Sequence, residues 1–477
     1  HDILPGSSIG PVYADSQRDH QQIRELGEQV REEALAALAQ ILPPQTALMA
    51  VNPVSFAGRR IGILPAELAP NKQLVDLRHR TPLITQAIDG GTLIEVDALA
   101  PYSLVPIGEV AQGNSLSPVS NSALAVSQEG DRHILENALL RVEVDRFGHI
   151  TAVFDKEAGR EVLAPGMVAN TLLAFEDRPM NFDAWDIDIF YEDRSETITQ
   201  VENISITETG PLRIALRIHR RYRSSVIVQT MYLYRDSKRL DFDTWVDWHE
   251  QHLLLKVAFP VNILSPVATF DIQWGNVQRP THRNTSWDWA RFETCGHKWA
   301  DLSEGDYGVA LLNDCKYGYD VHDNVMRLTL IKSATSPDPD ADQGEHVMTY
   351  SLLPHQGDWR TGVVPAGYDL NDPLIVRRVQ TSRTSAAPLA SLVTVDAPNV
   401  VIETIKQAED TGGIIVRLYE NERARGRVGL HTGFPLQTAY LCNLLEVNDL
   451  ELAVLENEVH FEITPYQIVT LRLVPRP

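Results

Sequence analysis

The chain has 477 residues and a formal charge of -22. This length exceeds what one hydrophobic core supports, so we expect about two to four domains. The negative charge makes nucleic acids and anionic membrane surfaces poor partners. The most apolar tract, residues 253–270, is interrupted by Lys256, Pro260, Asn262 and Pro266, so no membrane-spanning helix is expected.

The three cysteines, Cys295, Cys315 and Cys442, are widely spaced and form no CxxC motif. This pattern suits a reducing compartment better than a disulfide-stabilised fold, and it predicts a cytoplasmic protein. The chain opens at His1 without an initiating Met or a signal-like segment. We therefore expect a fragment, a processed product or one half of a longer protein.

Apolar residues recur at intervals near three and four in the first part of the chain. They are Ile23, Leu26, Val30, Leu35, Leu38 and Ile41. This period predicts one amphipathic helix of about 25 residues that ends before Pro43. Its apolar stripe needs a partner, and we expect a portion of the protein absent from this chain rather than the downstream β domain.

From Ala47 onward the apolar period changes from near four to two. Short strand patterns around a turn at Asp89 predict a small β-sandwich, and the polar residues 113–122 read as a linker. Beyond it, Leu140, Val142 and Val144 alternate with charged residues, and similar runs continue to about residue 390 without a helical pattern. So many strands imply a large two-sheet sandwich, followed by another small one.

The stretch 295–350 has regular strand patterns and a dense polar loop, residues 333–346. Strands at 308–317 and 327–332 bracket a turn, and another begins at Val347. A polar loop fixed by strands at both ends is a common place for recognition chemistry. Its carboxylates could hold a cation or sugar hydroxyls, or they could form a solvated acidic loop.

Two motifs combine carboxylates with an indole. Trp185 lies between Asp183 and Asp186, and Trp287 and Trp289 flank an Asp. Sugars bind to such groups through hydroxyl hydrogen bonds and stacking, but a tryptophan packed in a sandwich with acids at its rim fits equally well.

Three further groups are read as structural from spacing alone. His1 and Asp2 offer a metal ligand and a substrate contact, but a zinc site needs three or four ligands and a disordered terminus is favoured. In the motif 247–252, a strand puts Asp247 and His249 on one face and Glu250 on the other. Arginines recur along one predicted strand and predict a solvated sheet face paired with acids: Arg213, Arg217, Arg220, Arg221 and Arg223.

Several stretches along the chain carry one family resemblance. They are His1-Asp-Ile-Leu-Pro-Gly-Ser, Val51-Asn-Pro-Val-Ser, Asp183-Ala-Trp-Asp-Ile, Trp248-His-Glu-Gln-His-Leu-Leu-Leu-Lys, Lys298-Trp-Ala-Asp-Leu-Ser-Glu, Tyr307-Gly-Val-Ala-Leu-Leu-Asn-Asp-Cys-Lys-Tyr, Asp338-Pro-Asp-Ala-Asp-Gln-Gly-Glu-His and Arg417-Leu-Tyr-Glu. These stretches resemble the C-terminal half of the α-mannosidases of glycoside hydrolase family 38, in their bacterial form. The fold predicted is mainly β. It has a helical segment (1–45), a small sandwich (46–110), a large mutarotase-like two-sheet sandwich (111–390) and a C-terminal sandwich (391–477).

In that family a zinc ion held by two His and two Asp binds the sugar hydroxyls, and an Asp nucleophile forms a covalent mannosyl-enzyme. The resemblance implies that His1 is a zinc ligand and that Asp2 contacts substrate. It makes Asp342, Gln343 and His346 candidate substrate contacts, beside Trp185 from the motif above.

The other zinc ligands and the nucleophile have no counterpart in this chain. We therefore expect it to be inactive alone and not to retain zinc. Its expected partners are the N-terminal catalytic portion of the same enzyme and mannose-containing glycans. An exposed docking surface could also drive formation of a homo-oligomer.

Two other functions stay open. A carbohydrate-binding or structural β-sandwich module would bind sugar at Trp185 or Trp287 without zinc. A mutarotase-like enzyme would need a His and a carboxylate converging in a cleft, with His249 and Glu250 the first candidates. A sandwich fold alone does not distinguish these functions.

Overall fold

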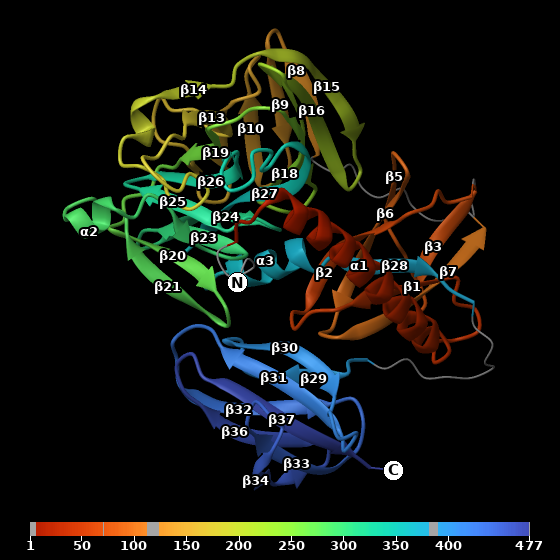
Figure 1. Cartoon of the computed structure of the whole chain (residues 1–477). Coiled ribbons are helices and arrows are strands. Elements are labelled where there is room, and N and C mark those ends of the chain that lie inside the picture. The colour runs from red at the N-terminus through yellow and green to blue at the C-terminus, as the bar shows by residue number, and fades with distance from the viewer. Residues whose placement is uncertain (1–5, 70, 112–123, 381–389, 477) are drawn as a thin grey trace. The chain divides into compact units, whose positions relative to one another are not determined.

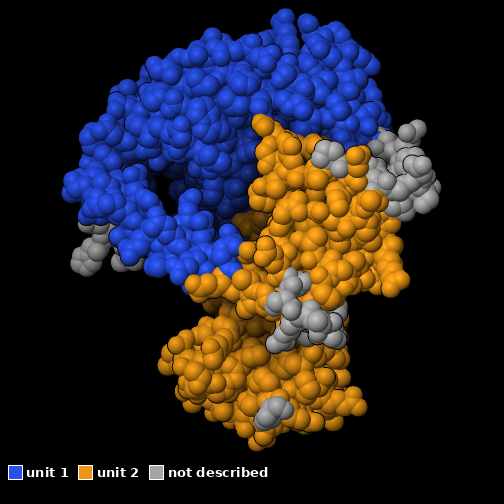
Figure 2. All heavy atoms as spheres, turned by 90° about the vertical axis from the view of Figure 1, so that its right-hand side faces the viewer, with its two compact units in different colours: residues 1–32, 120–271, 277–367 blue, residues 33–119, 272–276, 368–477 orange. Residues whose placement is uncertain are grey.

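The computed structural model describes residues 6–69, 71–111, 124–380 and 390–476. One long helix is followed by a chain built almost entirely of β-strands (Figure 1), which confirms the mainly β fold. The chain divides into two compact units, residues 1–32, 120–271 and 277–367, and residues 33–119, 272–276 and 368–477 (Figure 2).

Helix α1 (Gly10–Ala39) confirms the predicted amphipathic helix and extends it toward the N-terminus. Its buried residues, Leu35 and Ala39, lie near its C-terminal end, and Leu35 packs in an apolar cluster with Leu42 and Met49. The rest of the stripe stays in solvent, because Ile23, Leu26 and Val30 are 63%, 56% and 66% exposed. Among the described residues no helix has the length and apolarity needed to cross a membrane.

The first unit is built on a nine-stranded antiparallel sheet. Its strands, in order across the sheet, are β15 (Val201–Thr209), β16 (Arg213–Tyr222), β17 (Ser225–Tyr234), β18 (Leu240–Trp248), β27 (Gly344–Gln356), β24 (Tyr307–Asn313), β23 (Trp299–Ser303), β20 (Val267–Ile272) and β21 (Gly275–Pro280).

Two smaller sheets belong to the same sandwich. One has the order β14 (Ser195–Thr197), β13 (Thr171–Glu176), β19 (Leu253–Pro260), β26 (Val325–Lys332), β25 (Gly318–His322) and β22 (Thr294–Cys295). The other has the order β12 (Arg160–Glu161), β11 (Ile150–Asp155), β10 (Leu140–Val144), β9 (Arg132–Glu136) and β8 (Ala125–Glu129). Because β25 pairs with β26, an extra strand fills the turn predicted between residues 317 and 327.

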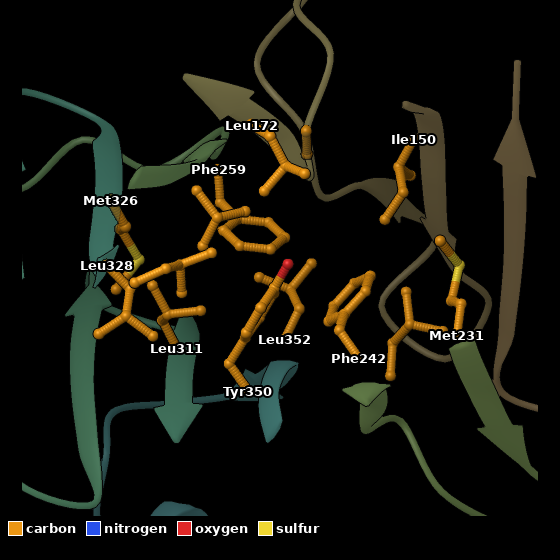
Figure 3. Close-up of a cluster of buried hydrophobic side chains, with 14 of the residues drawn as sticks. Ile150, Leu172, Met231, Phe242, Phe259, Leu311, Met326, Leu328, Tyr350 and Leu352 are labelled. Carbon is orange, nitrogen blue, oxygen red and sulfur yellow. The ribbon is translucent and has the colours of Figure 1, made fainter. Parts of the chain in front are cut away.

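Side chains from all three sheets form one core (Figure 3). The aromatic rings of Phe242, Phe259 and Tyr350 meet there, with centroids 5.1 Å apart for Phe242 and Tyr350 and 5.6 Å apart for Phe242 and Phe259. The Tyr350 hydroxyl is satisfied, since it accepts from Nε2 of Gln229 at 2.6 Å and donates to Oδ1 of Asn170 at 3.0 Å. The hydroxyl that Tyr350 brings into the core is therefore fully satisfied, as the low polarity of the core requires.

The second unit contains an eight-stranded sheet and a small sandwich. The eight-stranded sheet has the order β4 (Thr81–Pro82), β3 (Lys72–Asp76), β7 (Ser103–Ala111), β1 (Leu48–Asn52), β28 (Leu374–Arg378), β2 (Gly58–Leu64), β6 (Gly91–Leu99) and β5 (Thr85–Ile88). Strand β28 lies between β1 and β2, so residues 374–378 complete the sheet of the segment 46–110.

The C-terminal sandwich closes around its own apolar core. One sheet has the order β29 (Val393–Val395), β32 (Gly426–Thr432), β36 (Glu458–Ile463) and β35 (Val454–Leu455). The other has the order β30 (Val400–Gln407), β31 (Ile414–Glu420), β37 (Ile468–Pro475), β33 (Leu436–Cys442) and β34 (Asn448–Leu452).

Two short helices and one 3-10 turn interrupt the β region that the sequence pattern predicts to be free of helices. They are α2 (Ser286–Trp289), α3 (Val363–Asn371) and the 3-10 turn η1 (Tyr191–Asp193). Such short helices present too few apolar repeats for a period to be read from the sequence.

Truncation of the aromatic core should destabilise the large sandwich. Phe242 is fully buried, so Phe242→Ala leaves a cavity and should lower the free energy of unfolding by about 3–5 kcal/mol. Urea unfolding followed by tryptophan fluorescence measures this, because Trp248 lies in the same core. Phe154→Ala, at a side chain 40% exposed, is the control and should cost about 0.5 kcal/mol; equal losses would contradict this packing.

Candidate functional site

The polar loop 333–343, between β26 and β27, is tied to the loop that carries Trp185. The carboxylate of Asp183 accepts hydrogen bonds from the Thr335 backbone N at 2.7 Å, the Thr335 Oγ1 at 3.1 Å and the Ser336 backbone N at 3.2 Å. These two loops are separated by about 150 residues of sequence, and one carboxylate joins them. We call the two loops and the turn 249–252 the loop cluster.

Ionisation of Asp183 favours this junction. Burial raises the pKa of the Asp183 carboxyl, but hydrogen bonds from Thr335 and Ser336 outweigh burial and lower the pKa overall. The same two loops are joined again by Lys332, whose ammonium pairs with the buried Asp177 and donates to the Asp186 carbonyl at 3.0 Å. Contacts at Asp183 and at Asp186, on either side of Trp185 in the sequence, therefore hold the Trp185 loop in place.

His252 forms the third part of the loop cluster. Its backbone N donates to the Ser333 carbonyl at 2.7 Å, and its own carbonyl accepts from the Asp177 backbone N at 2.8 Å. It has a φ of +55°, a left-handed conformation that is uncommon for a side chain of this size. Its ring Nε2 lies 3.4 Å from Thr335 Oγ1, so the strained residue sits where the loops meet.

The motif 247–252 has a structural role at this turn. The Glu250 carboxylate is buried and accepts from the Ser224 backbone N at 2.9 Å and from Ser225 Oγ at 3.0 Å. Nε2 of His249 lies 2.9 Å from Oδ1 of Asp247, which confirms that these two share a face. The two candidates for a mutarotase-like acid–base pair, His249 and Glu250, therefore hold different partners and do not converge.

The start of α1 also lies against the polar loop. A Cβ added to Gly10 would be 3.3 Å from Oδ1 of Asp338, a carboxylate whose residue is only 9% exposed. The Ser8 backbone N is held by the Tyr13 hydroxyl at 2.8 Å. The segment that follows the first few residues thus begins its helix beside the loop cluster.

The predicted contact residues have different environments. Trp185 is 48% exposed, with its ring 5.6 Å from that of Phe182. Asp342 is exposed and has a left-handed φ of +58°. Its carbonyl accepts from Nε2 of His346 at 2.8 Å. Gln343 is anchored, because its Nε2 donates to the Glu250 carbonyl at 2.7 Å.

His1 and Asp2 lie outside the described residues. Within the described part of the chain, no group of three or more His, Cys, Asp or Glu side chains could hold a metal ion. The described residues therefore do not fit a zinc ion by themselves.

Sequence reasoning misses the residues that assemble the loop cluster. Thr335, Lys332 and Ser333 sit in an ordinary strand end and loop start, and their partners lie 80 or more residues away in sequence. No local sequence pattern predicts contacts between residues so far apart in the chain. The sequence indicates the Asp183 motif as a sugar-binding candidate because it combines carboxylates with an indole. In the structure the Asp183 carboxylate accepts hydrogen bonds that join two loops.

The sandwich domains and the loop cluster correspond to a known class. Residues 135–340 match the glycosyl hydrolases family 38 C-terminal domain, and residues 399–471 match the glycosyl hydrolases family 38 C-terminal beta sandwich domain. The chain therefore carries the C-terminal domains of glycosyl hydrolase family 38, as the motifs predict.

Relatives in this family are α-mannosidases. Alpha-mannosidase 2C1 of Mus musculus is 36% identical over 486 residues, which cover 99% of this chain and 44% of the relative. Alpha-mannosidase G of Dictyostelium discoideum is 31% identical over 532 residues, covering 99% and 47%. A family 38 protein from Enterococcus faecalis has the same fold, with a TM-score of 0.77 at 16% identity over 99% of this chain and 64% of that chain.

The chain thus spans about half the length of the curated relatives that it matches. The curated relatives named above come from eukaryotes, so the bacterial form stays a prediction.

Removal of the Asp183 charge should release the polar loop. Asp183→Asn keeps the shape but puts an amide where three donors converge, so the Thr335 and Ser336 amides should exchange about tenfold faster or more. Hydrogen–deuterium exchange of fragments spanning residues 333–343 measures this. The Asp183 pKa is depressed on folding, so its stabilisation is present above the unfolded-state pKa of about 3.9 and is lost as pH falls through the lower folded-state value.

Asp186→Asn is the matched control, because only the backbone carbonyl of Asp186 accepts from Lys332. It should leave the exchange of the loop unchanged at neutral pH. Equal exchange in both variants, or protection in the parent chain that does not weaken in acid, would contradict the role of Asp183.

Proposed function

We propose that this chain is the C-terminal part of a zinc-dependent retaining α-mannosidase, which hydrolyses α-mannosides only together with a catalytic portion like that of its relatives. In this proposal the loop cluster forms one wall of the substrate site. The observation that carries it is the junction of the Trp185 loop, the polar loop and the start of α1, all within the first unit.

The loop cluster offers groups that suit a sugar wall. Trp185 presents a half-exposed indole for the apolar face of a hexose, and the exposed Asp342 presents a carboxylate for hydroxyl groups. Trp185 and Asp342 both stand on loops that hydrogen bonds hold in place. Binding of a sugar would therefore cost little conformational entropy in these loops. His346 would act by holding the Asp342 backbone.

In the proposed enzyme the metal and the nucleophile belong mainly to the catalytic portion. His1 would supply one zinc ligand and Asp2 a neighbouring substrate contact, while the remaining ligands come from elsewhere. When bound, the zinc ion would supply a grip on sugar hydroxyls. Since one protein ligand does not retain zinc, this chain alone would be metal-free and inactive.

The exposed stripe of α1 supports a protein partner. Ile23, Leu26 and Val30 form consecutive turns of one helix face, and more than half of each side chain is in water. We assign this stripe to contact with the catalytic portion, because large exposed apolar surface marks interfaces. In the isolated chain the same stripe would favour self-association.

A cytoplasmic location is also proposed. All three cysteines are free, with Cys295 and Cys315 exposed. Exposed free thiols persist best in a reducing compartment.

The isolated chain should show no hydrolysis of an aryl α-mannoside in zinc-containing buffer, and it should bind much less than one zinc per chain after gel filtration. Colorimetric assay and elemental analysis of one sample measure both quantities, with an intact family 38 α-mannosidase assayed in parallel. The reason is that the described residues hold no metal cluster. Turnover with stoichiometric zinc would overturn the proposal, since a complete site would then lie within this chain.

Self-association of the isolated chain should depend on the α1 stripe. The double change Ile23→Glu and Val30→Glu should shift sedimentation velocity profiles toward the monomer by placing charges on the exposed apolar face. The control is Gln17→Glu with Gln21→Glu, which adds the same charge to exposed positions on the opposite face of α1. A monomeric parent chain at all concentrations, or equal shifts in both variants, would argue against this surface.

A further inference from the structure

A second polar pocket lies on the first unit, outside the loop cluster. Its volume is about 330 Å³, in the range of small-molecule sites. Except for Val325, its lining residues carry polar or charged side chains: Glu192, Thr281, Arg283, His322, Asp323 and Arg327. None of these belongs to the candidate substrate contacts.

The charges that line this pocket are already matched. Arg283 makes a bidentate pair with Glu192, with distances of 2.7 and 3.1 Å. Arg327 also pairs with Glu192, and its Nε donates to Oδ1 of the buried Asp320 at 2.5 Å. Burial raises the pKa of Glu192, but the hydrogen bonds from Arg283 and Arg327 lower it to about 2, so it stays ionised.

Matched charges favour one kind of ligand over another. A phosphate or carboxylate gains little, because each guanidinium already serves a carboxylate. A neutral polyhydroxylated ligand needs fixed donors and acceptors instead, which this network supplies. Nδ1 of His322 accepts from Nε of Arg283 at 3.3 Å, which fixes the imidazole in the pocket wall.

One of the two exposed indoles on α2 adjoins the pocket. Trp287 is 81% exposed and Trp289 is 45% exposed, both on α2. The Arg283 guanidinium lies 5.8 Å from the Trp289 ring centroid, which connects this indole to the pocket wall. Exposed indoles bury apolar area readily when a flat partner with C–H groups covers them.

The turn that carries these indoles is held in place. Thr285 caps α2, because its Oγ1 accepts from the Asp288 backbone N at 3.1 Å. The Asp288 carboxylate in turn accepts from Nη1 of Arg291 at 3.0 Å. A fixed aromatic surface loses little conformational entropy when a ligand binds.

We propose that this pocket and the α2 indoles form a second carbohydrate-binding site, which takes a neutral hexose unit of a glycan. The pocket donors and acceptors would bind the hydroxyl groups, and Trp289 would cover the C–H face of this unit, while Trp287 would contact the next unit. The choice of a mannose unit rests on the proposed function, whereas the choice of a neutral sugar rests on this pocket alone.

The site can be tested on the chain as it stands by fluorine NMR with 5-fluorotryptophan, which gives one resonance for each of its eight tryptophans. Single Trp→Phe variants assign the signals. An α-linked mannobiose should shift the Trp287 and Trp289 resonances saturably, and inorganic phosphate should not. Trp287→Ala should weaken mannobiose binding about tenfold, and Trp274→Ala, at an indole 39% exposed elsewhere, should leave it unchanged.

Several outcomes would overturn the site. The proposal would be wrong if neither α2 indole resonance shifts with mannobiose, if only the Trp185 resonance shifts, or if inorganic phosphate causes equal shifts. A change in sedimentation of Trp287→Ala without any sugar-dependent shift would assign the indoles to a protein interface instead. Binding of methyl α-glucoside but not methyl α-mannoside would overturn the choice of mannose. The NMR shifts do not depend on mannosidase activity. A failure of the proposed function would appear in the hydrolysis assay, and a failure of this second site would appear in the NMR titration.

Discussion

The Asp183 carboxylate is the interaction on which the loop cluster depends. Three donors from Thr335 and Ser336 converge on it, and no comparable contact joins the Trp185 loop to the described part of the polar loop except the Lys332 bridge. The loops themselves are polar and could not be fixed by burial. A charged hydrogen-bond acceptor gives two such loops a defined geometry that apolar packing could not.

Buried charge also supports the face that carries the second pocket. The Lys256 ammonium on β19 is fully buried and lies 2.7 Å from Asp320 and 3.2 Å from Glu293. Burial lowers the pKa of Lys256, but these two carboxylates outweigh burial and raise it, so the charge persists. Asp320 also accepts from Arg327, and the network continues to Glu192 at the pocket. The pocket geometry is thus anchored in a charge network whose inner pair, Lys256 and Asp320, is buried from solvent.

The sequence predicts the strands well because their pattern is local. Leu140, Val142 and Val144 are buried between polar neighbours, as their alternation requires. The arginine pattern misleads at two positions, since Arg213 and Arg220 are buried rather than solvated. Arg213 still pairs with an acid, Glu208, whereas Arg220 donates to the Gly148 carbonyl. The alternation of residue types along a strand shows which side chains share a face. It does not show whether a neighbouring sheet covers that face.

The chemistry of the loop cluster argues that it binds and positions rather than reacts. A glycosidase needs carboxylates that can attack a sugar or exchange a proton. Here Asp183 is held ionised by its loop contacts, Asp177 pairs with Lys332, and Glu250 is buried against Ser225. Because these acids stabilise the loops that would line the sugar, using one as a nucleophile would disturb the wall that orients the substrate. In the proposed enzyme a reactive pair would be better supplied by a separate portion, against which this wall could stay rigid through each reaction cycle.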